Sequence, residues 1–170
     1  MKKILFLVSL FAVLVACTDS EPTHATMIVK LTDAPADYEQ VLIDVLDVEI
    51  HSDQTGWQSM DLVESGIYDL LEFTNGMDTL LAQSELPEGR ISQMRLVLGD
   101  QNSVVVDGEE FPLDTPSSQQ SGLKFLIQAD LLAGIEYEMW IDFDAGKSIV
   151  NQGNGGYSLK PVIRTYTKAT

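Results

Sequence analysis

Cysteine is almost absent from this sequence. The chain of 170 residues contains one, Cys17. A single cysteine can form neither an intrachain disulfide nor a metal site built from cysteines. The length fits one ordinary domain, and hydrophobic residues make up 45% of the chain. We therefore expect one domain that is stabilised by burial of its apolar side chains.

Basic residues are also scarce. The chain has 10 Lys and Arg against 26 Asp and Glu, a formal charge of −16. A surface this negative repels phosphate, so nucleic acid is excluded as a partner, and an anionic bilayer repels it as well. The ordinary consequence of the charge is solubility, and a cation-binding surface is the alternative. Any attachment to a membrane must therefore use a covalent lipid.

Signatures of catalysis are missing. The two histidines are His24 and His51, and no Gly-x-Ser-x-Gly or His-Glu-x-x-His motif occurs. Residues 146–148, Gly-Lys-Ser, match the end of a phosphate-binding loop, but position 141 lacks the glycine that this loop requires. Pairs of carboxylates could hydrolyse glycosides, yet 26 acids produce such pairs by chance. The sequence predicts that the protein is not an enzyme.

The first residues have the pattern of an export signal. Lys2 and Lys3 precede an apolar run over residues 4–15, which is too short to span a bilayer as a helix. The run ends at Leu14-Val15-Ala16-Cys17, which resembles the lipobox of bacterial lipoproteins. Removal of residues 1–16 leaves 8 basic and 26 acidic residues, a charge of −18.

The lipobox resemblance implies that Cys17 carries the anchor. Its thiol would receive a diacylglyceryl group, and its new amino group an acyl chain such as palmitate. Several acyl chains give stable membrane attachment, whereas one does not. Residues 17–26 are then the lipidated cysteine and a flexible polar tether. Thr18 is not the aspartate that retains many lipoproteins at the inner membrane, so we expect a cell-envelope protein held at the outer membrane.

From residue 27 onward, apolar and polar residues alternate with period two, which indicates strands. Turn signals such as Asn75-Gly76 and Asp107-Gly108 separate eight or nine short segments of this kind. We predict an all-β fold over residues 27–167: a single antiparallel β-sandwich of the immunoglobulin-like or transthyretin-like kind, with a closed barrel as the alternative. At most one short helix is expected, near residues 77–84.

Several segments, in this order, resemble the DUF4382 family of bacterial lipoproteins, a domain of unknown function. The resemblance covers residues 27–166 and implies an exported, lipid-anchored β-sandwich without an established activity. The segments are Leu31-Thr32-Asp33-Ala34-Pro35, Asn75-Gly76, Leu86-Pro87-Glu88-Gly89, Arg95-Leu96-Val97-Leu98, Asn-Ser-Val-Val-Val-Asp-Gly at 102–108, Thr-Pro-Ser-Ser at 115–118, Gly122-Leu123-Lys124, Asp142-Phe143-Asp144-Ala145, and Gly-Gly-Tyr-Ser-Leu-Lys-Pro-Val-Ile-Arg at 155–164.

One set of polar residues stands out because it contains half of the basic residues that remain after residue 16. By alternation, Asp142 and Asp144 share one face of a strand, as do Lys160 and Arg164. If the strands are neighbours, a ladder of opposite charges results. The ladder either fixes strand register through salt bridges or lines a binding groove with Trp140 as a stacking platform. The set is Arg95, Lys124, Trp140, Asp142, Asp144, Lys160 and Arg164.

Calcium is the one cofactor that the sequence suggests. Carboxylates suit Ca²⁺, and Asp33 and Asp37 flank a loop that contains a proline. Asp142 and Asp144 lie at the end of a strand. No EF-hand pattern is present, so these four residues are only a candidate site.

Together these features predict a lipid-anchored, non-catalytic binding or accessory module of the cell envelope. Its partners would be the bilayer, through acylated Cys17, and a glycan, calcium or another envelope protein. A purely structural envelope component and a carbohydrate-acting hydrolase are the alternatives. Two tryptophans, Trp57 and Trp140, are few for an open sugar-binding platform.

Overall fold

The computed structural model describes residues 23–115, 122–153 and 155–170. Within them the chain forms strands and two short helical segments, and no helix is long and apolar enough to cross a membrane. The elements are β1 (His24–Asp33), β2 (Gln40–Ser52), β3 (Gly56–Ser59), β4 (Gly66–Asp69), the 3-10 helix η1 (Leu70–Phe73), β5 (Thr79–Pro87), β6 (Gly89–Leu98), β7 (Ser103–Val106), β8 (Glu109–Asp114), β9 (Leu123–Leu131), β10 (Glu136–Phe143), α1 (Ala145–Ser148), β11 (Ile149–Asn151), β12 (Tyr157–Leu159) and β13 (Ile163–Ala169).

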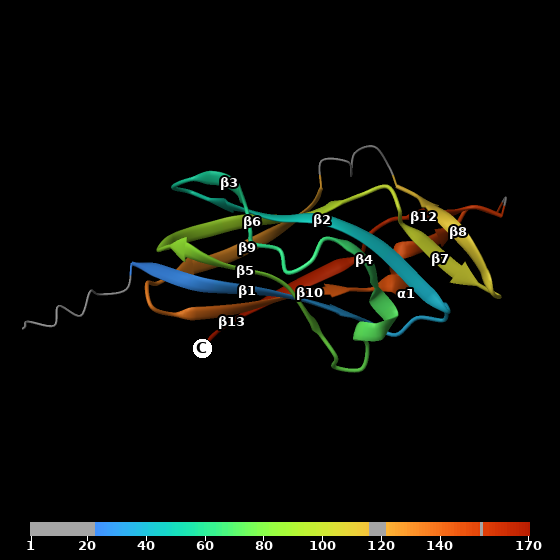
Figure 1. The fold of residues 1–170 in the computed structure, drawn as a ribbon, viewed down its shortest axis with the longest axis horizontal. Coiled ribbons are helices and arrows are strands. Elements are labelled where there is room, and N and C mark those ends of the chain that lie inside the picture. The colour runs from blue at the N-terminus through green and yellow to red at the C-terminus, as the bar shows by residue number, and fades with distance from the viewer. Residues whose placement is uncertain (1–22, 116–121, 154) are drawn as a thin grey trace, which may run out of the picture.

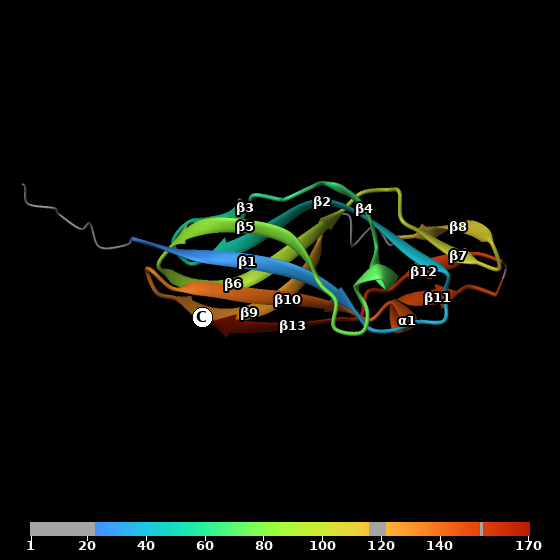
Figure 2. The ribbon, with the colours of Figure 1, turned by 60° about the horizontal axis from the view of Figure 1, so that its bottom comes forward.

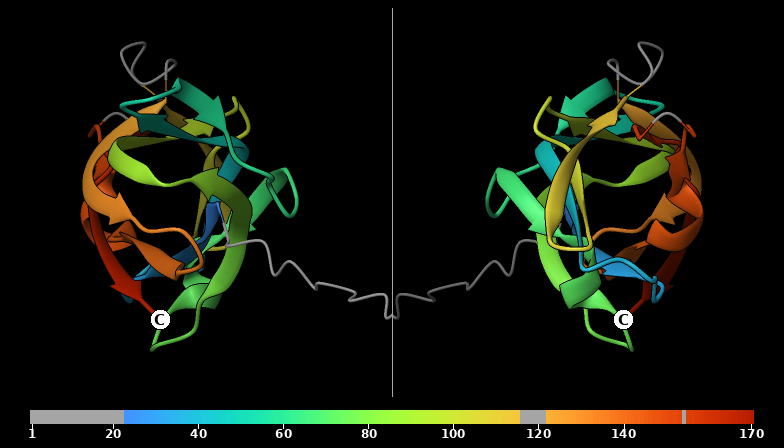
Figure 3. Two further views of the ribbon diagram at one scale, coloured as in Figure 1. Left: turned by 90° about the vertical axis from the view of Figure 1, so that its left-hand side faces the viewer. Right: turned by 90° about the vertical axis from the view of Figure 1, so that its right-hand side faces the viewer.

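Two sheets face each other across one apolar core, as Figures 1 and 3 show. The smaller sheet has the order β13-β10-β1-β5. The larger has the order β11-β12-β8-β7-β2-β6-β9, with β3 and β4 also paired to β2. The predicted all-β sandwich is confirmed. Both sheets end in edge strands, which excludes the closed barrel. The fold was expected to be antiparallel, but β1–β10 and β12–β8 are parallel pairs, so both sheets are mixed.

Strict alternation explains why these segments form strands with one buried face. In β10, Tyr137, Met139, Ile141 and Phe143 are buried, and the residues between them point outward. In β1, every second residue from Ala25 to Asp33 is buried. Because side chains alternate between the two faces of a strand, each sheet contributes one apolar layer to the core. The outer faces carry the polar side chains.

Several predicted boundaries were wrong. Strand β1 begins at His24, so residues 24–26 of the predicted tether belong to the sandwich. Most of the segment expected to hold a helical turn, 77–84, lies in β5, where pairing with β1 outweighs local preference. Alternation in the sequence predicts one last strand over residues 157–166, but this segment lies in two strands, since Pro161 has no N–H to continue a ladder.

The helical turns lie elsewhere, and each begins at an aspartate cap. Asp69 accepts a hydrogen bond from Leu71 N at the start of η1. Asp144 accepts one from Lys147 N at the start of α1. Such caps satisfy backbone N–H groups that lack a partner in the first turn.

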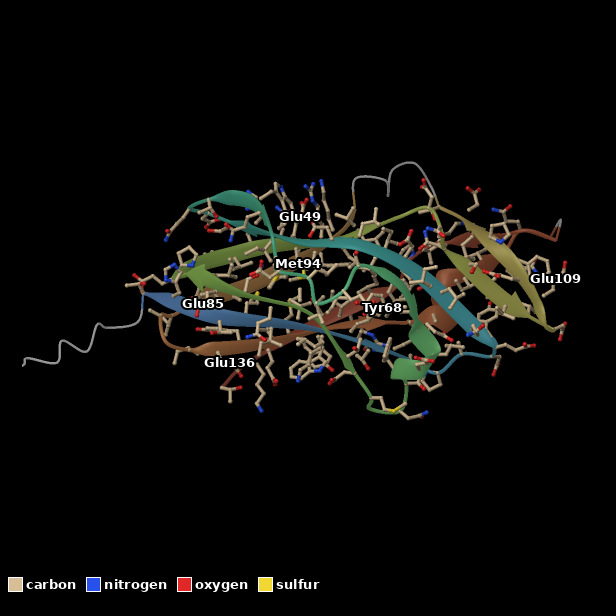
Figure 4. The ribbon with its side chains drawn as sticks, in the orientation of Figure 1. Glu49, Tyr68, Glu85, Met94, Glu109 and Glu136 are labelled. Atoms are coloured by element: carbon tan, nitrogen blue, oxygen red, sulfur yellow. The ribbon has the colours of Figure 1, made fainter. Side chains whose placement is uncertain are left out.

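The sandwich has two distinct ends. Strands β1 and β10 run in parallel, and β13 runs back along β10, so the chain enters at His24 and finishes beside the same end. Figures 1 and 2 show this arrangement, and Figure 4 places Glu85 and Glu136 toward this near end and Glu109 at the opposite, far end. The far end also holds α1 and the turn 107–108, where Gly108 N donates to Glu39.

Candidate functional site

The structure does not bring the predicted polar set together. Arg95 in β6 and Lys124 in β9 lie on the larger sheet. Trp140 and Asp142 in β10 and Arg164 in β13 lie on the smaller one. Asp144 caps α1, and Lys160 lies between β12 and β13. Six of the seven residues therefore form two separate clusters, one on each sheet, and in the described residues no ion pair joins Lys160 to either.

Trp140 is enclosed by its neighbours on the smaller sheet. Its ring stacks on Tyr166 of β13 at 5.0 Å between centroids and 11° between planes. On the other side, Lys30 Nζ of β1 lies 5.1 Å from the ring centroid. The indole N–H donates to Asp78 at 2.9 Å. Both faces of the ring are occupied, so the geometry favours a cross-strand packing role over a stacking platform for a sugar.

The carboxylates at the end of β10 are neutralised by nearby cations. Arg164 lies 3.8 Å from both Asp142 and Asp144. The Lys147 ammonium group also pairs with Asp144. The hydrogen bond from Lys147 and, to a lesser extent, the charge of Arg164 lower the pKa of the Asp144 carboxyl below its ordinary value, against the effect of burial. This geometry supports the salt-bridge interpretation for this part of the set.

The second cluster has Trp57 at its centre. Arg95 forms an ion pair with Glu49 on the neighbouring strand, and its guanidinium lies 4.5 Å from the Trp57 ring centroid. Lys124 Nζ lies 5.9 Å from the same ring. The His51 ring meets Trp57 edge-on at 5.3 Å.

Sequence reasoning missed Glu49 and Trp57 as partners of Arg95, and His51 as a partner of Trp57. The available signal was the turn 53–55, which sets His51 opposite Trp57 in the β2–β3 hairpin. His51 Nδ1 lies 3.0 Å from Ser92 Oγ. This histidine is therefore part of a packed polar cluster.

Asp33 is the most unusual titratable group of the described residues. It lies at the end of β1, is 5% exposed, and accepts a hydrogen bond from Ala145 N at 2.9 Å. Its Oδ2 atom is buried without a hydrogen-bond partner in the described residues. Burial raises the pKa of Asp33 to about 7, the backbone N–H groups of Ala145 and Ala34 oppose this rise, and the charges of Asp144 and Asp142 add to it.

The opposite pKa shifts of Asp33 and Asp144 resemble an acid–base pair of a hydrolase. Each residue, however, is only 5% exposed. A general acid must lie within hydrogen-bond reach of the substrate, so this pair cannot serve a sugar in the present structure. The carbohydrate-hydrolase alternative therefore gains no support here.

The candidate calcium ligands do not converge. Within residues 23–115, 122–153 and 155–170, no three His, Cys, Asp or Glu side chains gather closely enough to hold a metal ion. Asp37 borders a shallow hollow of about 360 Å³ with Pro35, Ala36, Tyr38 and Gly146. Asp142 and Asp144 already face cations. These contacts give the calcium hypothesis no geometric support.

The Asp33 corner joins three distant parts of the chain. Asp33 accepts a hydrogen bond from Ala145 N, and this bond links β1 to the start of α1. Asp144 N donates to Val162 O, and Ser148 Oγ accepts from Val162 N at 2.9 Å. Segments 31–35, 142–145 and 155–164, which carry much of the resemblance noted in the sequence, therefore meet at this corner. Cys17 lies outside the described residues, so its acylation stays a prediction.

Comparison with known proteins gives a family but no activity. No curated protein matches the chain. One solved structure, a proposed cell adhesion protein from Bacteroides eggerthii, aligns with a TM-score of 0.39 and 14% identity, covering 88% of this chain and 56% of that one. The family model for a domain of unknown function, DUF4382, matches residues 24–161. This match spans most of the chain, which therefore belongs to the DUF4382 family.

Proposed function

We propose that this protein is a lipid-anchored, non-catalytic binding module of the cell envelope. One observation carries the proposal: β1 begins at His24, seven residues after Cys17, at the end of the sandwich where the chain also finishes. An anchor at Cys17 would therefore hold the near end toward the bilayer. The far end would face away from it.

Simple dimensions support this geometry. Seven extended residues span at most about 24 Å. The 10 residues of β1 rise by about 33 Å. With β1 upright, Asp33 would thus lie about 33 Å farther from the membrane than His24, and the turn 107–108 would lie farther still (Figure 4). Acidic side chains would keep the domain from lying flat on an anionic bilayer.

Engagement of His51 and Asp144 in the fold favours binding over catalysis. His51 is packed between Ser92 and Trp57, and Asp144 is buried and paired. Cys17 would be consumed by the lipid. Both His51 and Asp144 are therefore engaged in the fold. A glycan, or a protein of the same envelope, is the expected kind of partner.

Replacement of the anchor tests the first half of the proposal. Cells that express the wild-type chain or Cys17→Ser are fed a clickable fatty acid and fractionated. We expect acyl label and membrane sedimentation for the wild type, and neither for Cys17→Ser. Label in the variant, or its absence in the wild type, would overturn lipid anchoring.

Orientation is tested with single cysteines, because Cys17 is the only native one and its thiol would be blocked. Glu88→Cys places a fluorophore at the near end, and Glu109→Cys places one at the far end. In proteoliposomes with a headgroup quencher, we expect quenching at position 88 and none at position 109. Equal quenching at both positions would show that the domain lies along the membrane.

A further inference from the structure

Strand β13 leaves one backbone edge open. It pairs with β10 on one side and is the last strand of the smaller sheet. Asp144 N donates to Val162 O, and Thr170 N donates to Glu136 O. Since hydrogen-bonded pairs alternate in an antiparallel ladder, the even-numbered residues of β13 bond to β10. The N–H and C=O groups of Ile163, Thr165 and Thr167 therefore point to the open edge.

No other described strand occupies this edge. Strand β9 of the larger sheet approaches β13, but the two form no ladder. In the described residues, no backbone hydrogen bond reaches the open side of Ile163, Thr165 or Thr167. An extended peptide can satisfy such a row of donors and acceptors by adding as a further strand.

The side chains beside the open edge are basic on a protein that is otherwise acidic. Residues 160–170 contain three cations and no Asp or Glu. Arg164, Tyr166 and Lys168 share the outer face of β13, and Tyr166 is 50% exposed. Lys168 is exposed and has no ion pair among the described residues. Arg164 is paired with Asp142 and Asp144, so Lys168 is the cation of β13 whose charge no ion pair in the described residues compensates.

The register with β10 shows which side chains suit this strand. Opposite Arg164, Tyr166 and Lys168 lie Asp142, Trp140 and Glu138. The pattern on β10 is thus acid, aromatic, acid at alternate positions. An incoming strand on the other side of β13 would meet the same three residues and gain from the same pattern.

A second copy of the chain is a poor occupant of this edge. Antiparallel pairing of two β13 strands about Tyr166 would set Arg164 opposite Lys168 of the other copy. Parallel pairing in register would set each cation against its own equivalent. Like charges directly opposite one another destabilise a sheet, so charge disfavours self-pairing through β13 in these two registers and favours an acidic partner.

We propose that the open edge of β13 is a strand-addition site for an extended acidic polypeptide segment. In this segment, two acidic side chains flank an aromatic or aliphatic one, and the three occupy alternate positions. The site gives the proposed binding module a partner class, but it does not depend on the lipid anchor. Failure of either proposal is therefore distinguishable from failure of the other.

The test uses the full chain purified in detergent and a labelled peptide matching the 7 residues of β13 in length, Thr-Glu-Val-Phe-Val-Asp-Thr. One control peptide has Lys in place of Glu and Asp. A second keeps the acids but is N-methylated at alternate residues, which blocks strand pairing. We expect binding of the first peptide alone, and slower amide exchange at Ile163, Thr165 and Thr167 when it is bound.

Two charge reversals on the protein form a matched pair. Lys168→Glu lies in β13, whereas Lys160→Glu makes the same change in net charge on an exposed residue before the strand. Loss of one favourable pair and gain of one repulsive pair should weaken peptide binding about tenfold for Lys168→Glu. Lys160→Glu should change it less than about twofold. Amide spectra of both variants check that they fold.

Four outcomes would overturn the proposal. No binding of the acidic peptide would show that Arg164 and Lys168 only protect the edge from pairing. Equal binding of the N-methylated peptide would show that the peptide is held by charge attraction and not by strand pairing. Equal weakening by both lysine reversals would show that the peptide does not bind beside Lys168. Amide protection of β13 that grows with protein concentration in the absence of peptide would make a second copy the occupant.

Discussion

At the residue scale, Asp33 should make stability fall as pH rises. Its folded pKa of about 7 lies above the ordinary value near 3.9, so the folded protein binds the proton more tightly than the unfolded chain. The protonated carboxyl's contribution is complete below about pH 4 and is lost as pH rises through about 7. The loss amounts to at most about 4 kcal/mol.

Asp33→Asn keeps an acceptor for Ala145 N and cannot ionise. We expect this variant to match the wild type near pH 4 and to exceed it in free energy of unfolding at pH 8, measured by urea denaturation. Asp33→Ala is the control, because it removes the acceptor and should be less stable than the asparagine variant at both pH values. Parallel pH profiles for wild type and Asp33→Asn would refute the assignment.

Gly99 is a second residue whose role rests on close packing. A Cβ atom there would overlap Asp44 Oδ2, and Asp44 is itself 5% exposed. Gly99→Ala should therefore cost about 1–3 kcal/mol in free energy of unfolding, since the buried carboxylate must move. Gly146→Ala is the matched control, because its nearest contact would be an ordinary 3.5 Å. Equal stability of the two variants, measured by thermal unfolding, would contradict this expectation.

At the element scale, Ser148 joins α1 to the segment that leads into β13. It is fully buried, donates to Asp144 O at 2.7 Å and accepts from Val162 N at 2.9 Å. Ser148→Ala leaves the Val162 N–H without its acceptor and should cost about 1–3 kcal/mol. Hydrogen exchange should accelerate at Val162 and change little in β6. Uniform acceleration across both sheets would show that the loss is global.

The elements also show what the sequence could reveal. Period-two alternation is enough to indicate the buried face of β10, and the turn signal Asp107-Gly108 indicates the hairpin of β7 and β8, because these features depend on neighbours along the chain. The parallel pairing of β1 with β10 joins residues more than a hundred positions apart, which no local pattern specifies. For the same reason, Arg95 and Arg164 were predicted to share a ladder although they lie on opposite sheets. Asp33 was proposed as a metal ligand, while its burial against Ala145 depends on that same long-range pairing.

At the scale of the whole molecule, charge should act through screening. The described residues carry 24 acidic and 8 basic side chains, so the acidic side chains of the folded state repel one another at low ionic strength. Added NaCl should raise the melting temperature by a few degrees up to about 0.2 M, where the Debye length is under 10 Å, and little beyond. A flat response would mean that the charges are already compensated locally.

The same measurement separates screening from a specific calcium site. CaCl₂ and MgCl₂ at one ionic strength should give the same melting temperature, because no three carboxylates converge in the described residues. A ligand that binds only the folded state stabilises it in proportion to the logarithm of its concentration, whereas screening saturates. A rise that is larger in CaCl₂, continues with concentration and is reversed by chelator would therefore establish a calcium site, and Asp37→Asn and Asp142→Asn would then locate it. Equal curves for the two salts would leave electrostatic screening as the whole effect of divalent cations on this domain.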